Sequence, residues 1–254
     1  MYHTTGFDRA GIIRLVEVID QFSISTGERI QCPPSLGLYD SVCITLIYLR
    51  RNRRQVELAE QYECSQSTIS RAIAALIPWI ERALRGYVPV AADLSPGEQY
   101  IVDGTLLPCW SWADRPKLYS GKHKTTGMNV QVVCDLAGNL RYVSNGIDGC
   151  RHDSAALEIS GILEGMDAGN WIGDKAYVGK GMITPIKRVN KRKLLDWQKE
   201  LNREVNKIRW VVERTISNLK TWRILHIDYR RPYETFAATV LAVLGLEFFR
   251  RTAE

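Results

Sequence analysis

Apolar residues recur with two different periods in two parts of this chain. Before residue 87 they recur every three to four residues, which predicts helices. After residue 98, short apolar runs bounded by turn-forming residues predict strands that alternate with helices. We therefore expect a helical domain over residues 1–86, a linker containing Pro and Gly over residues 87–98, and an α/β domain over residues 99–254.

Within the helical domain, residues 55–73 predict two short helices joined by a tight turn. Ser65 is placed to cap the second helix and to leave the polar residues of its first turn exposed. Those residues, and the arginines just before the first helix, are of types that contact phosphates and base edges in a major groove. They are Arg53, Arg54, Gln66, Ser67, Thr68 and Arg71. We favour a helix-turn-helix that binds DNA over an ordinary helical hairpin.

The second domain is expected to contain three antiparallel strands, a helix, a fourth strand and two further helices. The strands are predicted over residues 100–102, 129–134, 140–144 and 171–173, with a short fifth strand over 182–186. The helices are predicted over residues 153–160, 194–221 and 233–250. This order is the layout of a ribonuclease-H-like nuclease core, in which helices flank a mixed sheet.

Three carboxylates occupy positions in this layout that suit a metal site. Asp103 ends the apolar run of the first strand, Asp174 follows the fourth strand, and Glu213 lies within the long helix. Hard divalent cations prefer carboxylate oxygens, and two such ions can activate a water or sugar hydroxyl and stabilise a leaving oxygen. Taken singly, each aspartate is more often a cap or turn former, so the prediction depends on their joint placement.

Basic residues accompany these carboxylates. Arg209 and Lys220 lie at helical spacing from Glu213, where they could hold DNA phosphates on either side of it. The simpler interpretation is an exposed Arg–Glu pair that contributes roughly 0.2–0.5 kcal/mol. Lys122 and Lys124 precede the second strand, and they fit a contact with the DNA backbone and a solvated loop equally well.

The sequence resembles the DDE transposases of bacterial insertion sequences, in the group related to insertion sequence five. The motifs that carry the resemblance are Val102-Asp103-Gly104-Thr105, Gly173-Asp174-Lys175-Ala176-Tyr177, and Val212-Glu213-Arg214 followed by Leu219-Lys220. In related transposases the third motif reads Tyr-x2-Arg-x3-Glu-x6-Lys. Here Arg209, Glu213 and Lys220 fit that motif, whereas Asn206 stands in the place of the Tyr.

The resemblance implies a function and a set of site residues. Asp103, Asp174 and Glu213 would form the catalytic triad and bind two Mg²⁺ or Mn²⁺ ions per site. The reaction would be strand cleavage at the terminal inverted repeats of double-stranded DNA, followed by strand transfer to target DNA. A homodimer in the synaptic complex is the expected assembly.

The charge distribution agrees with a polyanionic partner. The formal net charge is +6, and residues 187–254 hold 16 of the 34 Lys and Arg residues but only 8 of the 28 Asp and Glu residues. A solvated helix face would explain the same excess. The six Cys residues show no zinc-site spacing, and no stretch has the pattern of a signal peptide or a membrane span. We therefore expect a cytoplasmic protein with reduced thiols, no membrane partner, and association with the nucleoid when bound to DNA.

Two other functions fit the same pattern. One is a DNA-binding regulator that kept the fold and lost the chemistry, and the other is a nuclease that cuts without strand transfer. Two sites are also undecided. His152-Asp153 could support the metal site from outside it or cap the following helix, and Trp110 and Trp112 could stack on bases of an opened DNA end or pack within the protein.

Overall fold

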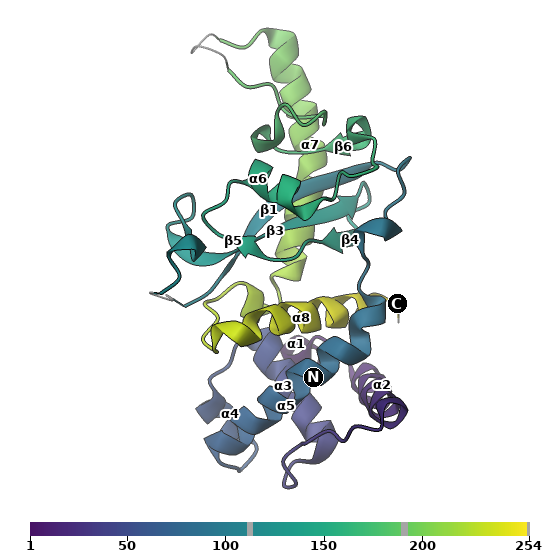
Figure 1. Cartoon of the computed structure of the whole chain (residues 1–254), viewed down its shortest axis with the longest axis vertical. Helices are drawn as coiled ribbons and strands as arrows, with labels where there is room; N and C mark the ends of the chain where they lie inside the picture. The colour runs from purple at the N-terminus through teal and green to yellow at the C-terminus, as the bar shows by residue number, and fades with distance from the viewer. Residues whose placement is uncertain (111–113, 189–192, 253–254) are drawn as a thin grey trace. The chain divides into compact units, whose positions relative to one another are not determined.

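The computed structural model describes residues 1–110, 114–188 and 193–252 (Figure 1). The chain forms two compact units. The first contains Met1–Val88 and Lys220–Glu254, and the second contains Pro89–Leu219. The change between the units after Val88 falls within the stretch predicted as a linker. The return to the first unit at Lys220 differs from the expectation that residues 99–254 fold as one domain.

The first unit is built from helices. They are α1 (Tyr2–Thr5), α2 (Arg9–Thr26), α3 (Gly37–Arg51), α4 (Gln55–Gln61), α5 (Gln66–Leu84) and α8 (Phe236–Arg251). Short 3₁₀ turns are η1 (Arg85–Tyr87), η6 (Arg223–Leu225) and η7 (Tyr233–Thr235). Ser65 caps α5 as predicted, because its hydroxyl accepts a hydrogen bond from the backbone N–H of Thr68 (3.2 Å).

Helices α4 and α5 form the predicted two-helix hairpin. Between them the chain turns at Glu63, which adopts the left-handed backbone conformation with φ 49°. Ala59 of α4 and Ile69 and Ile73 of α5 are buried. The two helices therefore pack through these apolar side chains, whereas Val56 of α4, which we also expected to face inward, is exposed.

Aromatic packing assigns the C-terminal segment to the first unit. The ring of Phe7 lies 6.3 Å, centroid to centroid, from the rings of both Trp222 and Phe249. A Cβ atom on Gly245 of α8 would lie only 2.8 Å from the Cβ of Leu84 in α5, so glycine is needed where these helices meet. These contacts join residues more than a hundred positions apart, and the local pattern of the sequence does not encode them.

The second unit is organised around a mixed sheet. Its strands are β1 (Tyr100–Pro108), β2 (Tyr119–Ser120), β3 (Thr125–Asp135), β4 (Leu140–Val143), β5 (Ile147–Asp148) and β6 (Trp171–Ile172). β3 pairs antiparallel with β1 and β4, and β6 lies parallel to β1 on its other side. This arrangement confirms the predicted mixed sheet. The strand predicted over 182–186 is wrong, because this segment contributes only an isolated bridge between Ile183 and Ile172.

Two helices cover opposite faces of this sheet. Ile101 of β1 packs with Val212 of α7 (Asp196–Leu219), whereas the adjacent Val102 packs with Leu157 of α6 (Asp153–Ser160). Successive residues of a strand face opposite sides, so the buried run of β1 serves both layers. Figure 1 shows α6 in front of the sheet and α7 behind it.

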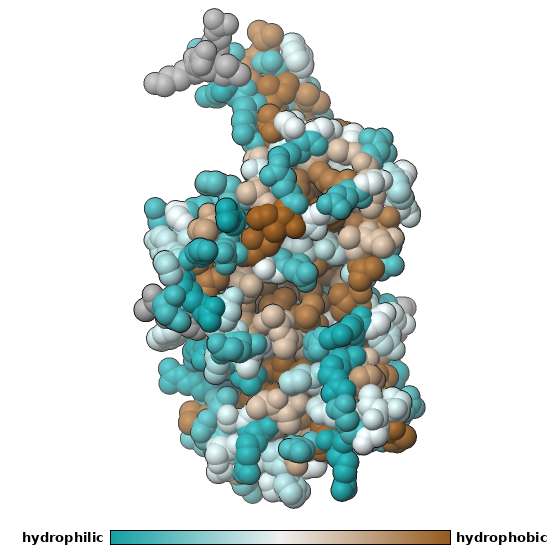
Figure 2. Space-filling view, viewed as in Figure 1, coloured by the Kyte–Doolittle hydropathy of each residue, from teal (hydrophilic) through white to brown (hydrophobic). Residues whose placement is uncertain are grey.

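The first turns of α7 project beyond the sheet. Figure 2 shows apolar residues interspersed with hydrophilic ones on this projecting part. Trp197 and Leu201 are among the exposed apolar side chains.

No helix in the described residues is long and apolar enough to cross a membrane.

Candidate active site

Two parallel strands bring the two predicted aspartates to one edge of the sheet. In the pairing of β1 with β6, Ile101 lies opposite Ile172. Asp103 and Asp174 each follow that pair by two residues, so the parallel register delivers both beyond the same end of β6. Asp174 also accepts a hydrogen bond from the backbone N–H of Lys175 (2.6 Å), which holds its carboxylate at the start of the next turn.

One guanidinium group joins these aspartates. In Arg209 of α7, Nη2 lies 3.3 Å from Oδ2 of Asp103 and Nη1 lies 3.4 Å from Oδ1 of Asp174. The side chain of Arg209 is 10% exposed, against 17% for Asp103 and 36% for Asp174. The Nε atom of Arg209 is buried and has no hydrogen-bond partner among the described residues. A single, incompletely satisfied cation therefore lies between the two carboxylates.

Arg209 does not fully compensate for the burial of the Asp103 carboxylate, because the pKa of Asp103 stays above its ordinary value. Burial raises the pKa of Asp103 to about 6, and the nearby carboxylates of Asp174 and Asp153 add to the rise. Arg209 opposes it, as does the backbone N–H of Gly104, which donates to Oδ1 of Asp103 at 2.9 Å. A cation of higher charge would favour the ionised carboxylate more strongly than the arginine does.

A third carboxylate, Asp153, lies against Gly104, the residue after Asp103. A Cβ atom on Gly104 would lie 2.6 Å from Oδ1 of Asp153, so only glycine leaves room for this carboxylate. Asp153 accepts hydrogen bonds from Nζ of Lys122 (2.7 Å) and Nδ2 of Asn129 (2.9 Å). Although burial opposes it, these two donors hold the pKa of Asp153 below its ordinary value.

These contacts bear on the two interpretations of His152-Asp153. His152 occupies the N-cap of α6 but makes no capping hydrogen bond with its side chain. Asp153 instead bonds outward to Asn129, which accepts from Nε2 of Gln131 (3.2 Å). Gln131 in turn accepts a hydrogen bond from the hydroxyl of Tyr177 (2.6 Å). A buried chain of polar groups therefore holds the Asp153 carboxylate, while His152 is the N-cap residue of α6 without a side-chain capping bond. A supporting role at the metal site stays a prediction.

The third predicted carboxylate stands apart from the cluster. Glu213 lies one turn after Arg209 on α7 and is exposed, whereas it is Arg209 that contacts Asp103 and Asp174. Over residues 1–110, 114–188 and 193–252, no three His, Cys, Asp or Glu side chains are placed to hold a metal ion together. The two aspartates supply oxygen donors that fit a divalent cation, and Arg209 already marks a position for positive charge between them.

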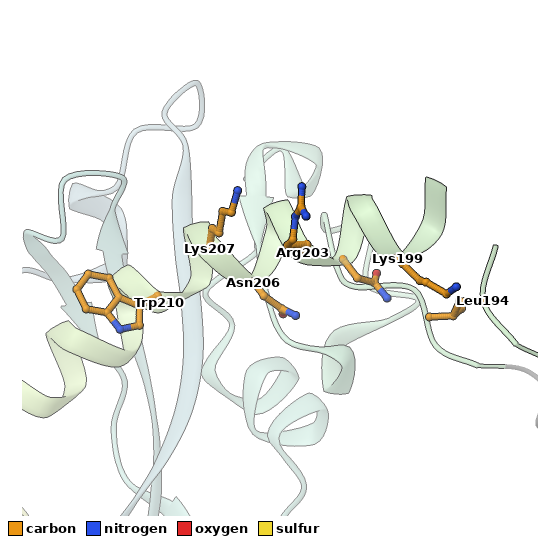
Figure 3. A pocket seen from close by; sticks show the side chains of 7 residues that line it. Leu194, Lys199, Arg203, Asn206, Lys207 and Trp210 are labelled. Carbon is orange, nitrogen blue, oxygen red and sulfur yellow. The ribbon is translucent and has the colours of Figure 1, made fainter. Parts of the chain in front are cut away.

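A hollow of about 770 Å³ runs along α7 near Glu213 (Figure 3). Figure 3 shows side chains from successive turns of α7 around it, including Asn206 and Trp210. Trp210 precedes Glu213 by three residues and Asn206 precedes it by seven, so the three share one side of the helix. Lys199, Arg203 and Lys207 also line the hollow. Their ion pairs with acidic neighbours on α7 are exposed and therefore weak.

Most predicted DNA contacts of the first unit are exposed. They are Arg53, Arg54, Gln66, Ser67 and Arg71. The expectation that Thr68 is an exposed contact is wrong, because its side chain is buried and its residue is only 7% exposed. Its hydroxyl lies 2.9 Å from that of Ser65, so the capping arrangement turns Thr68 inward.

The other predicted contacts have varied environments. Lys122 is engaged at the carboxylate cluster, whereas Lys124 is exposed and adopts the left-handed conformation with φ 55°. Lys220 lies just past the end of α7 and is partly buried, and burial lowers its pKa. Trp110 is exposed, as stacking on DNA would require, and Trp112 lies outside the described residues.

Comparison with known proteins identifies the family. Residues 102–247 match the model of the DDE superfamily endonuclease, and residues 34–86 match the model of the helix-turn-helix of DDE superfamily endonucleases. A protein of Streptomyces albus G, named as a transposase for insertion sequence element IS112, is 34% identical over 197 residues, which cover 76% of this chain and 73% of the relative. A protein of Microchaete diplosiphon, named as a transposase for insertion sequence element IS702, is 27% identical over 227 residues, covering 84% and 80%. No solved structure matches this chain.

These matches confirm the predicted helix-turn-helix and the predicted transposase family. They do not name the group related to insertion sequence five, so that finer placement stays a prediction. The DDE endonuclease domain implies dependence on a divalent metal ion, and the helix-turn-helix implies binding to DNA. The chain belongs to the DDE superfamily of endonucleases and is a DNA transposase with an N-terminal helix-turn-helix.

Proposed function

We propose that this transposase binds the terminal inverted repeats of its own element, cleaves the DNA there and transfers the freed ends to target DNA. The observation that carries the proposal is the placement of Asp103, within β1, and Asp174, just after β6, at corresponding positions of a parallel strand pair, with Arg209 between them. Most buried polar groups in folded proteins have a hydrogen-bond partner, but the buried Nε atom of Arg209 has none among the described residues. Such an arrangement suits a site that exchanges this arginine for a metal ion.

In this proposal Asp103, Asp174 and Glu213 hold Mg²⁺ or Mn²⁺, two ions per site. When bound, these ions would activate a water or a 3′ hydroxyl and stabilise the leaving oxygen. Asp103 and Asp174 orient their oxygens at the sheet edge. Asp153 keeps its negative charge beside them and increases the attraction for cations. Glu213 joins from α7, one turn from Arg209.

Arg209 has two successive roles. Without metal it balances part of the charge of Asp103 and Asp174. With a divalent cation held by these carboxylates, the guanidinium of Arg209 would be free to bind a DNA phosphate, for which its planar donors are well suited. Lys220 is proposed to bind a second phosphate, and Lys124 a backbone position nearby.

The first unit is proposed to recognise the repeat. Gln66, Ser67 and Arg71 at the start of α5 would reach base edges or phosphates, and Arg53 and Arg54 would contact the backbone. A homodimer would pair the two ends of the element before cleavage. The cytoplasm, with association to the nucleoid through bound DNA, is the proposed location.

A cleavage assay tests the proposal. A labelled duplex taken from the DNA that flanks the coding sequence is incubated with the full-length protein and Mn²⁺ or Mg²⁺. Wild type should nick the duplex at a repeat end, and Asp103→Ala should retain the gel shift but lose cleavage at least about a hundredfold, since several kcal/mol of charge stabilisation are lost.

Three other outcomes would contradict parts of the proposal. A wild-type protein that shifts the duplex but never cuts it would be a DNA-binding regulator. One that cuts but never joins ends to a target plasmid would be a nuclease. Cleavage by Asp103→Ala at the wild-type rate would remove Asp103 from the site.

A further inference from the structure

The C-terminal segment adds arginines to the surface of the helix-turn-helix. A hollow of about 400 Å³ in the first unit is lined by Arg53 and Arg54, which precede α4, and by Arg230 and Arg231, which precede α8. Gln66, the first residue of α5, lines it as well. None of the described residues around this hollow is a carboxylate. Four guanidinium groups therefore line one space without a neighbouring acid on its wall.

Hydrogen bonds fix this juxtaposition. Nη2 of Arg230 donates to both the backbone carbonyl and the Oδ1 atom of Asn52, at 3.2 Å each. Asn52 ends α3 and is buried, so Arg230 is anchored to the turn that leads into α4. The anchor joins residues 178 positions apart and holds the next residue, Arg231, at the hollow.

One hydrogen-bond donor of Arg231 lacks an acceptor among the described residues. Its Nη1 atom is buried and has no hydrogen-bond partner in the part of the chain that the structure describes. A buried donor left unpaired is unfavourable, so an anion in the hollow would gain from bonding to it. Tyr48 cannot serve as that anion at neutral pH, because burial raises its pKa to about 12.

We propose that this hollow binds a backbone phosphate of double-stranded DNA and that Arg231 is the contribution of the C-terminal segment to the helix-turn-helix interface. Guanidinium groups bind phosphate through paired, charge-assisted hydrogen bonds. The phosphate would lie beside Gln66, next to the predicted base-reading turn of α5. This inference rests on the proposed function, since it assumes that the first unit binds the terminal repeat.

The test measures binding of the full-length protein to a fluorescent duplex from the flanking DNA, by anisotropy, across 50–300 mM salt without divalent metal. Three variants are compared with wild type: Arg231→Gln, Arg231→Lys, and Arg29→Gln as an exposed arginine of the same unit that does not line the hollow. The loss of one phosphate contact weakens binding to DNA of every sequence. It also reduces the slope of log affinity against log salt concentration, called the salt slope here, by about one. Thermal melting of each variant checks that it folds.

Arg231→Gln should lower affinity about tenfold at 150 mM salt and reduce the slope by about one. Arg231→Lys should keep the slope while losing part of the affinity, because lysine keeps the charge but not the planar fork. Arg29→Gln should match wild type. If Arg231→Gln folds and binds with the wild-type slope, the inference is wrong while the proposed function stands. If wild type itself fails to bind the duplex, the proposed function fails and this inference with it.

Discussion

Glu247 in the first unit and Asp103 in the second are both carboxylates that contact arginines, but they differ in how fully their oxygens are paired. Glu247 of the first unit is fully buried and accepts hydrogen bonds from Nε1 of Trp222 (2.9 Å), from Arg250 (2.9 Å) and from Arg251 (3.2 Å). Asp103 of the second unit shares its one arginine with another aspartate, and its pKa is raised to about 6 mainly by burial.

The difference separates a structural acid from a functional one. A buried charge is retained for stability only when its oxygens are fully paired, as they are at Glu247. An acid that is buried, crowded by other acids and short of donors is held in an unfavourable state, and such states concentrate at active sites. We therefore expect removal of Glu247 to lower the stability of the fold, and removal of Asp103 to affect metal binding and cleavage.

The largest effect on folding is expected at Glu247. Glu247→Ala leaves Trp222 and two arginines without their acceptor, so the free energy of unfolding should fall by about 3–5 kcal/mol. Urea denaturation measures the loss. Glu17→Ala, which removes an exposed glutamate of α2 in the same unit, should change it by less than about 0.5 kcal/mol. Equal effects of the two substitutions would refute the structural role of Glu247.

Metal binding should stabilise the protein through the second unit. At Mn²⁺ concentrations about a hundredfold above the dissociation constant, the gain is about 2.7 kcal/mol, which raises the melting temperature by several degrees. The gain should disappear on chelation with EDTA and in Asp103→Asn, Asp174→Asn. It should persist in Glu247→Gln. A rise that survives in the double aspartate variant would place the metal elsewhere.

A methyl group added at Gly104 should lower the free energy of unfolding, by less than Glu247→Ala does. The Cβ atom of Gly104→Ala would lie 2.6 Å from Oδ1 of Asp153, which Lys122 and Asn129 hold in place, so we expect a loss of about 1–3 kcal/mol. Gly97→Ala is the matched control in the same unit, because nothing lies within 4 Å of its new methyl group. Thermal melting that shows no difference between the two variants would contradict the packing described here.

The smallest expected change is a gain. Asp103→Asn removes an unfavourable buried charge but also a partner of Arg209, and the net stabilisation at pH 7 should be about 1 kcal/mol. Because the folded pKa of Asp103 lies above its ordinary value of 3.8, the folded wild type binds more protons between about pH 4 and 6. Wild-type stability from this group therefore falls as pH rises through about 6. The gain of the variant should shrink as the pH is lowered from 7 to 4, and a constant difference across that range would argue against a raised pKa.

The sequence predicts the sheet and its two aspartates because their signals are local. Apolar runs mark β1, β3 and β6; Asp103 follows the apolar run Tyr100–Val102 within β1, and Asp174 follows β6. Parallel pairing of β1 with β6 then brings Asp103 and Asp174 together without further information. The long amphipathic stripe of α7 likewise places Arg209 on the buried side of that helix.

Other features escape the sequence because they depend on packing between distant segments. No local pattern links Trp222 to Phe7, or Arg230 to Asn52, and so the sequence does not predict that the C-terminal segment packs in the first compact unit. The sequence offers Asp153 as a candidate outer residue of the metal site, but it does not predict that Lys122 and Asn129 donate hydrogen bonds to this carboxylate.

The central claim is that Glu213, although exposed and separate from the aspartates in this structure, completes the metal site on DNA. The most direct test is metal-dependent cleavage of the flanking duplex by Glu213→Gln, compared with Glu204→Gln, which changes another exposed glutamate of α7. The account predicts that Glu213→Gln binds the duplex with wild-type affinity but loses cleavage at least about a hundredfold, whereas Glu204→Gln cleaves normally. Cleavage by Glu213→Gln at the rate of Glu204→Gln would contradict the claim and leave the two aspartates to act with another ligand.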